Sequence, residues 1–128
     1  MTARVDEYKV TEEFDVSVYK GLYLREARSS LSALRQELAC LQDDLADQAA
    51  LRQAHRAAHT LKGMSATMQY KALAALGRAL EEPLAQADGA GLTLSCGQCD
   101  ELLAMCDEFE KKLNRLEAAD NLSTGATF

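Results

Sequence analysis

Four successive segments of this chain place apolar or small residues three and four positions apart, the spacing that gathers side chains on one face of a helix. Leu and Ala supply most of these positions, and both enter a helix at little entropic cost. The stripes are Leu24, Ala27, Leu31, Leu34, Leu38, Leu41 and Leu45; Leu51, Ala54, Ala58, Leu61, Ser65 and Met68; Leu73, Leu76, Leu80, Leu84 and Ala87; and Leu102, Cys106, Phe109, Leu113 and Leu116. No segment alternates as a strand would, so the sequence predicts an all-α fold, an antiparallel up-down four-helix bundle.

Helix-end signals separate the stripes. Asp47 is the predicted N-cap of the second helix, and Ser95 with Gln98 three residues later forms a capping box before the fourth. Residues 88–91 contain two glycines and break the third stripe. Pro83 lies inside that stripe, where it removes a backbone hydrogen bond, so we expect it to kink or shorten the helix.

Composition limits the classes of function. Hydrophobic residues make up 48% of the 128 residues and charged residues 27%, which is typical of one globular domain. The net charge of −6 argues against nucleic acid as a partner. No apolar run approaches the roughly 20 residues that span a bilayer, and the N-terminus has no apolar stretch of signal-peptide type. We therefore expect a cytoplasmic protein without membrane insertion.

The pattern divides the chain into three parts. We expect a flexible N-terminal segment at residues 1–14, the bundle at residues 15–117, and a linker or tail at residues 118–128, where the sequence is polar and aperiodic. The chain is either excised from a longer protein or free-standing, and its sequence leaves both open.

The second predicted helix combines residue types suited to anion transfer. His55 and His59 lie one turn apart, and Lys62 and Gly63 follow His59 at three and four residues, so all four share one strip. His59 is beside the buried stripe, where a neutral imidazole could act as a nucleophile near pH 7. Lys62 would offset phosphoryl charge, and Gly63 would leave room for a partner. The same pattern also fits an ordinary surface histidine in a helical protein-interaction module.

The four cysteines suggest a rival class. Cys40, Cys96, Cys99 and Cys106 are expected to be reduced, three of them at core positions. The Cys96–Cys99 spacing fits a metal or redox site, but no second cysteine pair or βαβ setting accompanies it. A di-iron bundle would need a glutamate three residues before each histidine, and neither has one. The sequence thus predicts no metal site.

The segment Arg56-Ala-Ala-His-Thr-Leu-Lys-Gly-Met-Ser-Ala-Thr-Met68 closely resembles the phosphorylation-site segment of histidine phosphotransfer (HPt) domains, in particular the N-terminal domain of CheA chemotaxis kinases. Tyr23-Leu-Arg-Glu-Ala-Arg-Ser-Ser-Leu31 resembles that family's first helix, and Leu73-Ala-Ala-Leu-Gly-Arg-Ala-Leu-Glu-Glu82 its third. The resemblance covers about residues 15–117. It implies that the chain folds as an HPt-like bundle and that it functions in two-component signal transduction, in the chemotaxis branch.

The resemblance implies roles for single residues. His59 matches the phosphoryl-accepting histidine, and Lys62 and Gly63 match the pair that follows it in the family. Glu81 matches the glutamate that orients the imidazole. Arg78 stands where a second histidine is usual, and could still contact phosphate.

The resemblance also implies partners. His59 would accept a phosphoryl group from ATP through a histidine-kinase catalytic domain and pass the phosphohistidine's group to the aspartate of a response-regulator receiver domain. The chain has no glycine-rich nucleotide loop, so ATP and Mg²⁺ would be bound by the partner domains, and this chain would hold no cofactor. It would act as part of a histidine kinase only if excised from one. Gln69-Tyr70 replaces a usual Gly-Phe, a difference that bears on the end of the helix and on the partner surface. Arg78 and Gln69 together keep open a degenerate HPt domain that binds a receiver without carrying phosphate.

Overall fold

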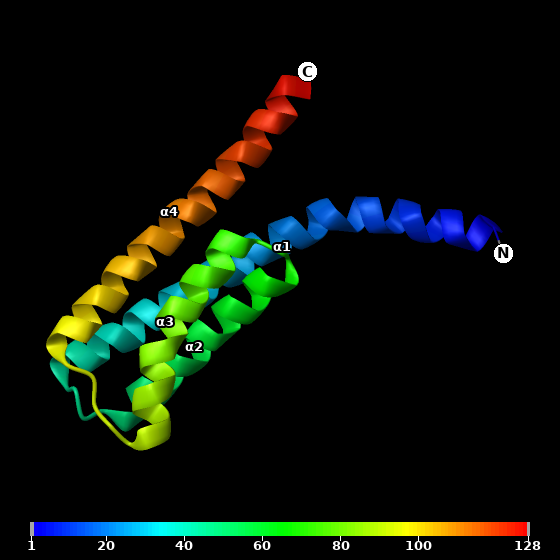
Figure 1. Ribbon diagram of the computed structural model, residues 1–128. Helices are drawn as coiled ribbons and strands as arrows, with labels where there is room; N and C mark the ends of the chain where they lie inside the picture. Colours follow the sequence, from blue (N-terminus) through cyan, green and yellow to red (C-terminus); the bar gives the residue numbers. More distant parts are fainter. Residues whose placement is uncertain (1, 128) are drawn as a thin grey trace.

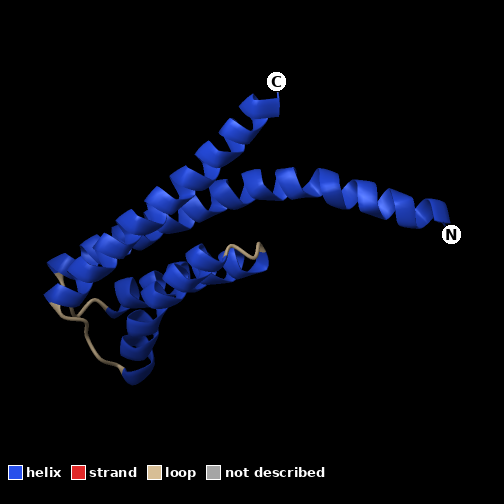
Figure 2. Ribbon diagram, turned by 45° about the horizontal axis from the view of Figure 1, so that its top comes forward, coloured by secondary structure: helices blue, strands red, loops and turns tan. Residues whose placement is uncertain are grey.

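The computed structural model describes the backbone of residues 2–127 and the side chains of residues 18–119. Four helices make up the fold, and Figure 1 shows successive helices running in opposite directions: α1 (Thr2–Asp43), α2 (Gln48–Thr67), α3 (Lys71–Ala90) and α4 (Cys96–Thr127). α2 packs against α1 and α3, and α4 packs against α1 and α3. Figure 2 shows helices and loops only over this range. The predicted all-α antiparallel bundle is confirmed.

The four apolar stripes meet in one core. Phe109 of α4 is fully buried in a single cluster that includes leucines from α1, α2 and α3. Each such side chain contributes about 1.5–3 kcal/mol when it leaves water. The stripe members at the margins are only partly buried: Leu45, Met68, Leu76 and Leu116. The core therefore holds α2 and α3 side by side. Polar side chains of these two helices that lie outside the core can then meet one another.

The predicted caps are present. Asp47 is the N-cap of α2 and accepts a hydrogen bond from the Ala50 amide at 3.0 Å. Before α4, Ser95 Oγ accepts from the Gln98 amide at 3.1 Å, and Gln98 Oε1 accepts from the Ser95 amide at 2.9 Å. This reciprocal pair is the capping box that the sequence predicted.

α2 ends in a tight turn despite lacking the glycine expected there. Gln69 has φ +61°, a left-handed conformation that costs a side-chain-bearing residue about 1–2 kcal/mol. The turn is closed by hydrogen bonds from the Tyr70 amide to the Ser65 carbonyl and from the Gln69 amide to the Ala66 carbonyl, both 3.0 Å. This is the Schellman pattern, so α2 ends in a closed turn at Gln69 although no glycine is present there.

α3 is longer than two sequence features suggested. It continues through Pro83 and ends at Ala90, so shortening at the proline was the wrong alternative. Residues 88–90 also remain helical, and Gly91 alone takes the left-handed conformation, at φ +66°. As a result Asp88 still belongs to α3.

Fewer cysteines are buried than the sequence predicted. All four are free thiols, but only Cys99 and Cys106 are buried, whereas Cys40 and Cys96 are exposed. The prediction of three core cysteines was therefore wrong. Burial raises the pKa of Cys106 to about 11 and also raises that of Cys99. These two groups are therefore core thiols rather than thiolates.

The terminal segments keep their status as predictions. The helical bounds of α1 and α4 extend into residues 1–14 and 118–128, but these segments lie largely outside the residues whose side chains are described. Over the described part of the chain, none of the helices combines the length and hydropathy needed to cross a bilayer.

Candidate functional site

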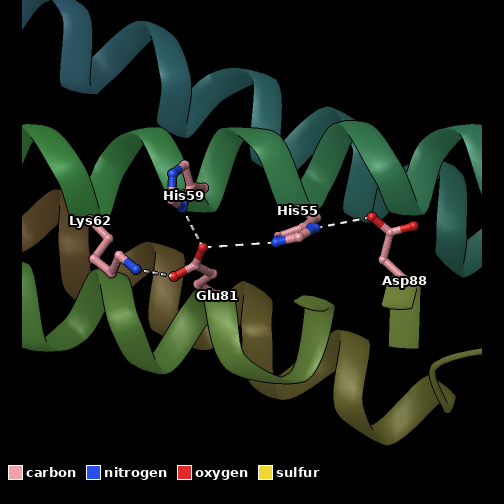
Figure 3. A network of polar contacts seen from close by, with 5 residues as sticks. All are labelled: His55, His59, Lys62, Glu81 and Asp88. Carbon is pink, nitrogen blue, oxygen red and sulfur yellow. Dashed lines mark hydrogen bonds and ion pairs between the residues drawn. The ribbon is translucent and has the colours of Figure 1, made fainter. Parts of the chain in front are cut away.

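His59 of α2 and Glu81 of α3 form the centre of the site. His59 is 65% exposed and Glu81 only 12%, and the His59 Nδ1 atom lies 2.5 Å from Glu81 Oε2. Figure 3 shows the two side chains meeting between the helices. Since an ionised carboxylate only accepts hydrogen bonds, Nδ1 must carry the proton. In a neutral ring, Nε2 is then left with its lone pair.

Lys62 occupies the other oxygen of the same carboxylate. Its Nζ lies 2.6 Å from Glu81 Oε1, so Glu81 joins the ammonium group to the imidazole. Burial alone would raise the pKa of Glu81, but the hydrogen bonds from Lys62 and His59 outweigh it, and the pKa is lowered. Glu81 is therefore ionised at neutral pH and holds both side chains.

His55 and Asp88 extend this network by one turn. His55 Nδ1 lies 3.0 Å from Asp88 Oδ2, and its Nε2 lies 3.8 Å from Glu81 Oε2. The four-residue spacing from His59 placed His55 on the same strip of α2. No role for His55 was predicted from the sequence, and Asp88 was missed because it was assigned to a helix break.

Gly77 is a second residue that sequence reasoning missed. It is buried on α3, and a Cβ added there would lie 2.8 Å from the Lys62 Cα. The backbones of α2 and α3 therefore approach closely one turn before Glu81. A glycine inside a helix costs about 1 kcal/mol of stability relative to alanine. A glycine in the middle of a predicted helix is therefore itself a sign that close packing requires it, and this sign was present in the sequence.

The remaining predicted residues behave differently. Gly63 is exposed, and a Cβ added there would meet nothing within 4 Å, so the surface beside Lys62 is open. Arg78 is 74% exposed, and its Nε lies 3.7 Å from Glu82 Oε1 on the same helix. The structure thus brings His59, Lys62 and Glu81 together, but it does not bring Arg78 into their contacts.

His59 lines a surface hollow together with His55, Arg56, Thr60 and Glu81. A separate and mostly apolar hollow begins one turn further along α2, at Gly63, and lies between Tyr19, Leu22 and Tyr23 of α1 and Met64 and Met68. Within the part of the chain with described side chains, no three His, Cys, Asp or Glu residues gather as metal ligands would.

Comparison with known proteins identifies the class. The family model for the Hpt domain matches residues 18–119. The chain belongs to the Hpt domain family. Its function is therefore phosphotransfer, and the resemblance seen in the sequence is confirmed. Among curated proteins, the chain is 33% identical over 96 residues to the chemotaxis protein CheA of Bacillus subtilis (strain 168), covering 75% of this chain and 14% of that protein.

Solved structures agree with this assignment. The CheA phosphotransferase domain from Thermotoga maritima superimposes with a TM-score of 0.72 at 28% identity, covering 77% of this chain and 93% of that one. A solution structure of the histidine phosphotransfer domain of CheA gives a TM-score of 0.73 at 28% identity, covering 79% of this chain and 76% of that one. Because the chain spans only about 14% of the length of the curated relative, these matches establish the domain and not the activity of a whole kinase.

Proposed function

We propose that His59 is the residue of this Hpt domain that accepts the phosphoryl group, and that Nε2 is the attacking atom. The observation that carries the proposal is the contact of His59 Nδ1 with Glu81 Oε2 at 2.5 Å. An imidazole whose one nitrogen is held as a donor presents the other as a nucleophile, which is the orienting logic of a catalytic triad. The exposure of His59 makes that atom accessible to a second protein.

In the first transfer, the Nε2 lone pair would form a bond to the γ-phosphorus of ATP. The bond from that phosphorus to the β,γ-bridging oxygen would break, and ADP would leave with the electron pair. Glu81 would stabilise the positive charge that develops on the ring, since it already accepts the Nδ1 proton. Lys62 would offset the charge of the incoming phosphoryl group.

The partners follow from this chemistry. A histidine-kinase catalytic domain would supply ATP and Mg²⁺, and the aspartate of a response-regulator receiver domain would accept the group in a second transfer. The open surface at Gly63 would let either partner approach. We place the chain in a cytoplasmic chemotaxis pathway, because the relative it matches is named a chemotaxis protein. Arg78 would contact phosphate only after leaving Glu82.

The test is phosphorylation by a kinase in trans. The purified chain is mixed with ATP, Mg²⁺ and the catalytic core of a chemotaxis-type histidine kinase that is active on its own HPt domain, and intact mass is recorded. We expect the mass of one phosphoryl group, lost on mild acid treatment as a phosphoramidate bond requires. His59→Gln should gain none.

A second variant separates chemistry from folding. His55→Gln changes the neighbouring histidine and should still gain one phosphoryl group. If the wild-type chain gains nothing from the kinase or from phosphoramidate while its helical circular dichroism is intact, the carrier role is wrong. A helical interaction module that binds a receiver without phosphate would then be the better description.

A further inference from the structure

Two cations flank His59 on α2, and they differ in their contacts. Lys62 follows His59 by three residues, and its Nζ lies 2.6 Å from Glu81 Oε1. Figure 3 shows this side chain turned toward the carboxylate. Arg56 precedes His59 by three residues and is exposed, and no ion pair or side-chain hydrogen bond joins it to another residue of the range 18–119. The charge of Lys62 is therefore partly offset by Glu81, whereas that of Arg56 is not offset by any carboxylate in this range.

Arg56 lies where two surface hollows adjoin. One hollow contains His59 and Glu81. The other lies between α2 and α1, with Glu37 on its α1 side, and Arg56 and Thr60 line both. Because neither carboxylate forms an ion pair with Arg56, the guanidinium can turn toward His59 without losing a partner.

Helix geometry brings an occupied His59 close to Arg56. Residues three apart on a helix are neighbours, with Cβ atoms about 5–6 Å apart. Side chains lean toward the N-terminus of their helix, so His59 extends over the turn that carries Arg56 and not over the turn that carries Gly63. Glu81 holds Nδ1, which leaves Nε2, and any group bonded to it, on the other side of the ring. The long side chain of an arginine reaches a phosphoryl group at that position.

We propose that Arg56 is a catalytic residue of the phosphotransfer, whose guanidinium donates hydrogen bonds to the oxygens of the phosphoryl group as it is transferred to His59 Nε2. The inference rests on the proposed role of His59. A planar guanidinium presents its N–H donors as a fork that matches two oxygens of one phosphate. Its charge is balanced only when the phosphoryl group arrives, so Arg56 stabilises the transferred group without first leaving another anion.

The experiment measures the rate at which phosphoramidate phosphorylates His59, because this donor needs no partner protein. Nε2 forms a bond to phosphorus, the phosphorus–nitrogen bond of the donor breaks, and ammonia leaves with the electron pair of that bond. Arg56→Gln removes the guanidinium and should slow the reaction by about 10-fold, as expected for the loss of a hydrogen bond from a charged donor. Intact mass recorded over time gives the rates.

Two variants serve as comparisons. Arg52→Gln is the matched control, since Arg52 is an exposed arginine one turn further from His59 and lines neither hollow. Its loss should leave the rate almost unchanged, because exposed charges at that separation are screened by salt. Arg56→Lys keeps the charge without the fork, and its rate should lie between those of wild type and Arg56→Gln. Circular dichroism of each variant establishes that the helices are retained.

Phosphorus NMR of the phosphorylated chain tests the contact itself. The phosphohistidine signal of Arg56→Gln should differ in chemical shift from that of wild type, because the guanidinium no longer contacts the phosphoryl oxygens. The signal of Arg52→Gln should coincide with that of wild type. A role of Arg56 in helix stability alone would leave all three signals at the same shift.

The outcomes separate this inference from the proposed function. If wild type is phosphorylated at His59 and Arg56→Gln reacts as fast as Arg52→Gln, Arg56 does not act on the phosphoryl group. If Arg56→Gln is slow only when a kinase is the donor, Arg56 contacts the partner protein instead, and the inference is equally wrong. If neither donor phosphorylates His59 of wild type, the proposed function fails and this inference fails with it.

Discussion

Within residues 18–119, two sets of charged contacts join helices, and they differ in how far water is excluded from the side chains. Between α2 and α3, Glu81 is 12% exposed and contacts Lys62 and His59. Between α1 and α4, Arg28 lies 2.9 Å from Glu117 and Arg35 lies 3.0 Å from Asp107, with side chains 32–67% exposed. Exposed pairs of this kind contribute at most about 1 kcal/mol. A shielded carboxylate holds its partners in fixed geometry, so the α2–α3 contacts suit catalysis, whereas the α1–α4 contacts only help to join helices.

Removing the charge of Glu81 should have the largest effect on the rate. In Glu81→Gln, an amide replaces the carboxylate, so the Nδ1 proton is held weakly and the imidazole is free to turn. We expect phosphorylation of His59 by phosphoramidate to slow by about 100-fold, with the helical circular dichroism retained. Glu82→Gln is the matched control, because Glu82 is exposed and pairs only loosely with Arg78 at 3.7 Å. If the two variants were phosphorylated at equal rates, the shielded carboxylate of Glu81 would have no larger role in the reaction than an exposed one.

Adding a methyl group at Gly77 should disturb the close approach of α2 and α3. The new Cβ would lie 2.8 Å from the Lys62 Cα, so Gly77→Ala should lower the free energy of unfolding by about 1–3 kcal/mol. It should also slow phosphorylation by moving Glu81 away from His59. Gly21→Ala is the control, since nothing lies within 4 Å of its Cβ, and it should stabilise by about 0.5–1 kcal/mol. Denaturant unfolding of both variants measures the difference. If Gly77→Ala is as stable as Gly21→Ala, the close approach of α2 and α3 does not require a glycine at position 77.

Acid should weaken the α2–α3 contacts in a definite direction. The pKa of Glu81 is lowered from 4.5 on folding, so its contribution to stability is fully present above the unfolded value and is lost as pH falls through the folded one. The difference in free energy of unfolding between wild type and Glu81→Gln should shrink as the pH falls below about 4.5. Denaturant titrations at acid pH measure it. A difference that stays undiminished from about pH 4.5 to about pH 2 would contradict the assigned ionisation.

The smallest effect is expected between α1 and α4. Arg28→Met removes the contacts with Glu117 and Asn114 and should lower the free energy of unfolding by less than about 1 kcal/mol. It should leave the rate of His59 phosphorylation unchanged. Added salt should reduce the difference in stability between wild type and this variant, since exposed charges are screened. A loss above about 2 kcal/mol would show that the exposed pairs do more than join helices.

Local patterns predicted most of the fold. The apolar stripes and the caps at Asp47 and Ser95 depend on neighbours within a few residues, and all are present. The end of α3 was placed too early, because Asp88 and Gly89 can remain helical and the chain takes the left-handed conformation only at Gly91. The stretch from residue 88 to 90 keeps its helical hydrogen bonds.

The sequence predicted some residues of the site and missed others. The relation of His59 to Lys62 follows from a three-residue spacing, but Glu81 is 22 residues away, and only the family resemblance pointed to it. Asp88 and Gly77 were missed because their roles depend on how α3 is aligned with α2. No local spacing specifies how α3 is aligned with α2. The same alignment leaves Arg78 facing solvent.

The central claim is that Glu81 holds Nδ1 of His59 so that Nε2 takes the phosphoryl group. Long-range proton–nitrogen NMR of the phosphorylated, ¹⁵N-histidine-labelled chain tests it directly, because the two ring nitrogens give distinct signals and coupling to phosphorus marks the one that is modified. We predict phosphorus on Nε2 of His59, with Nδ1 still protonated. Phosphorus on Nδ1, or on His55 or any other residue, would contradict the account.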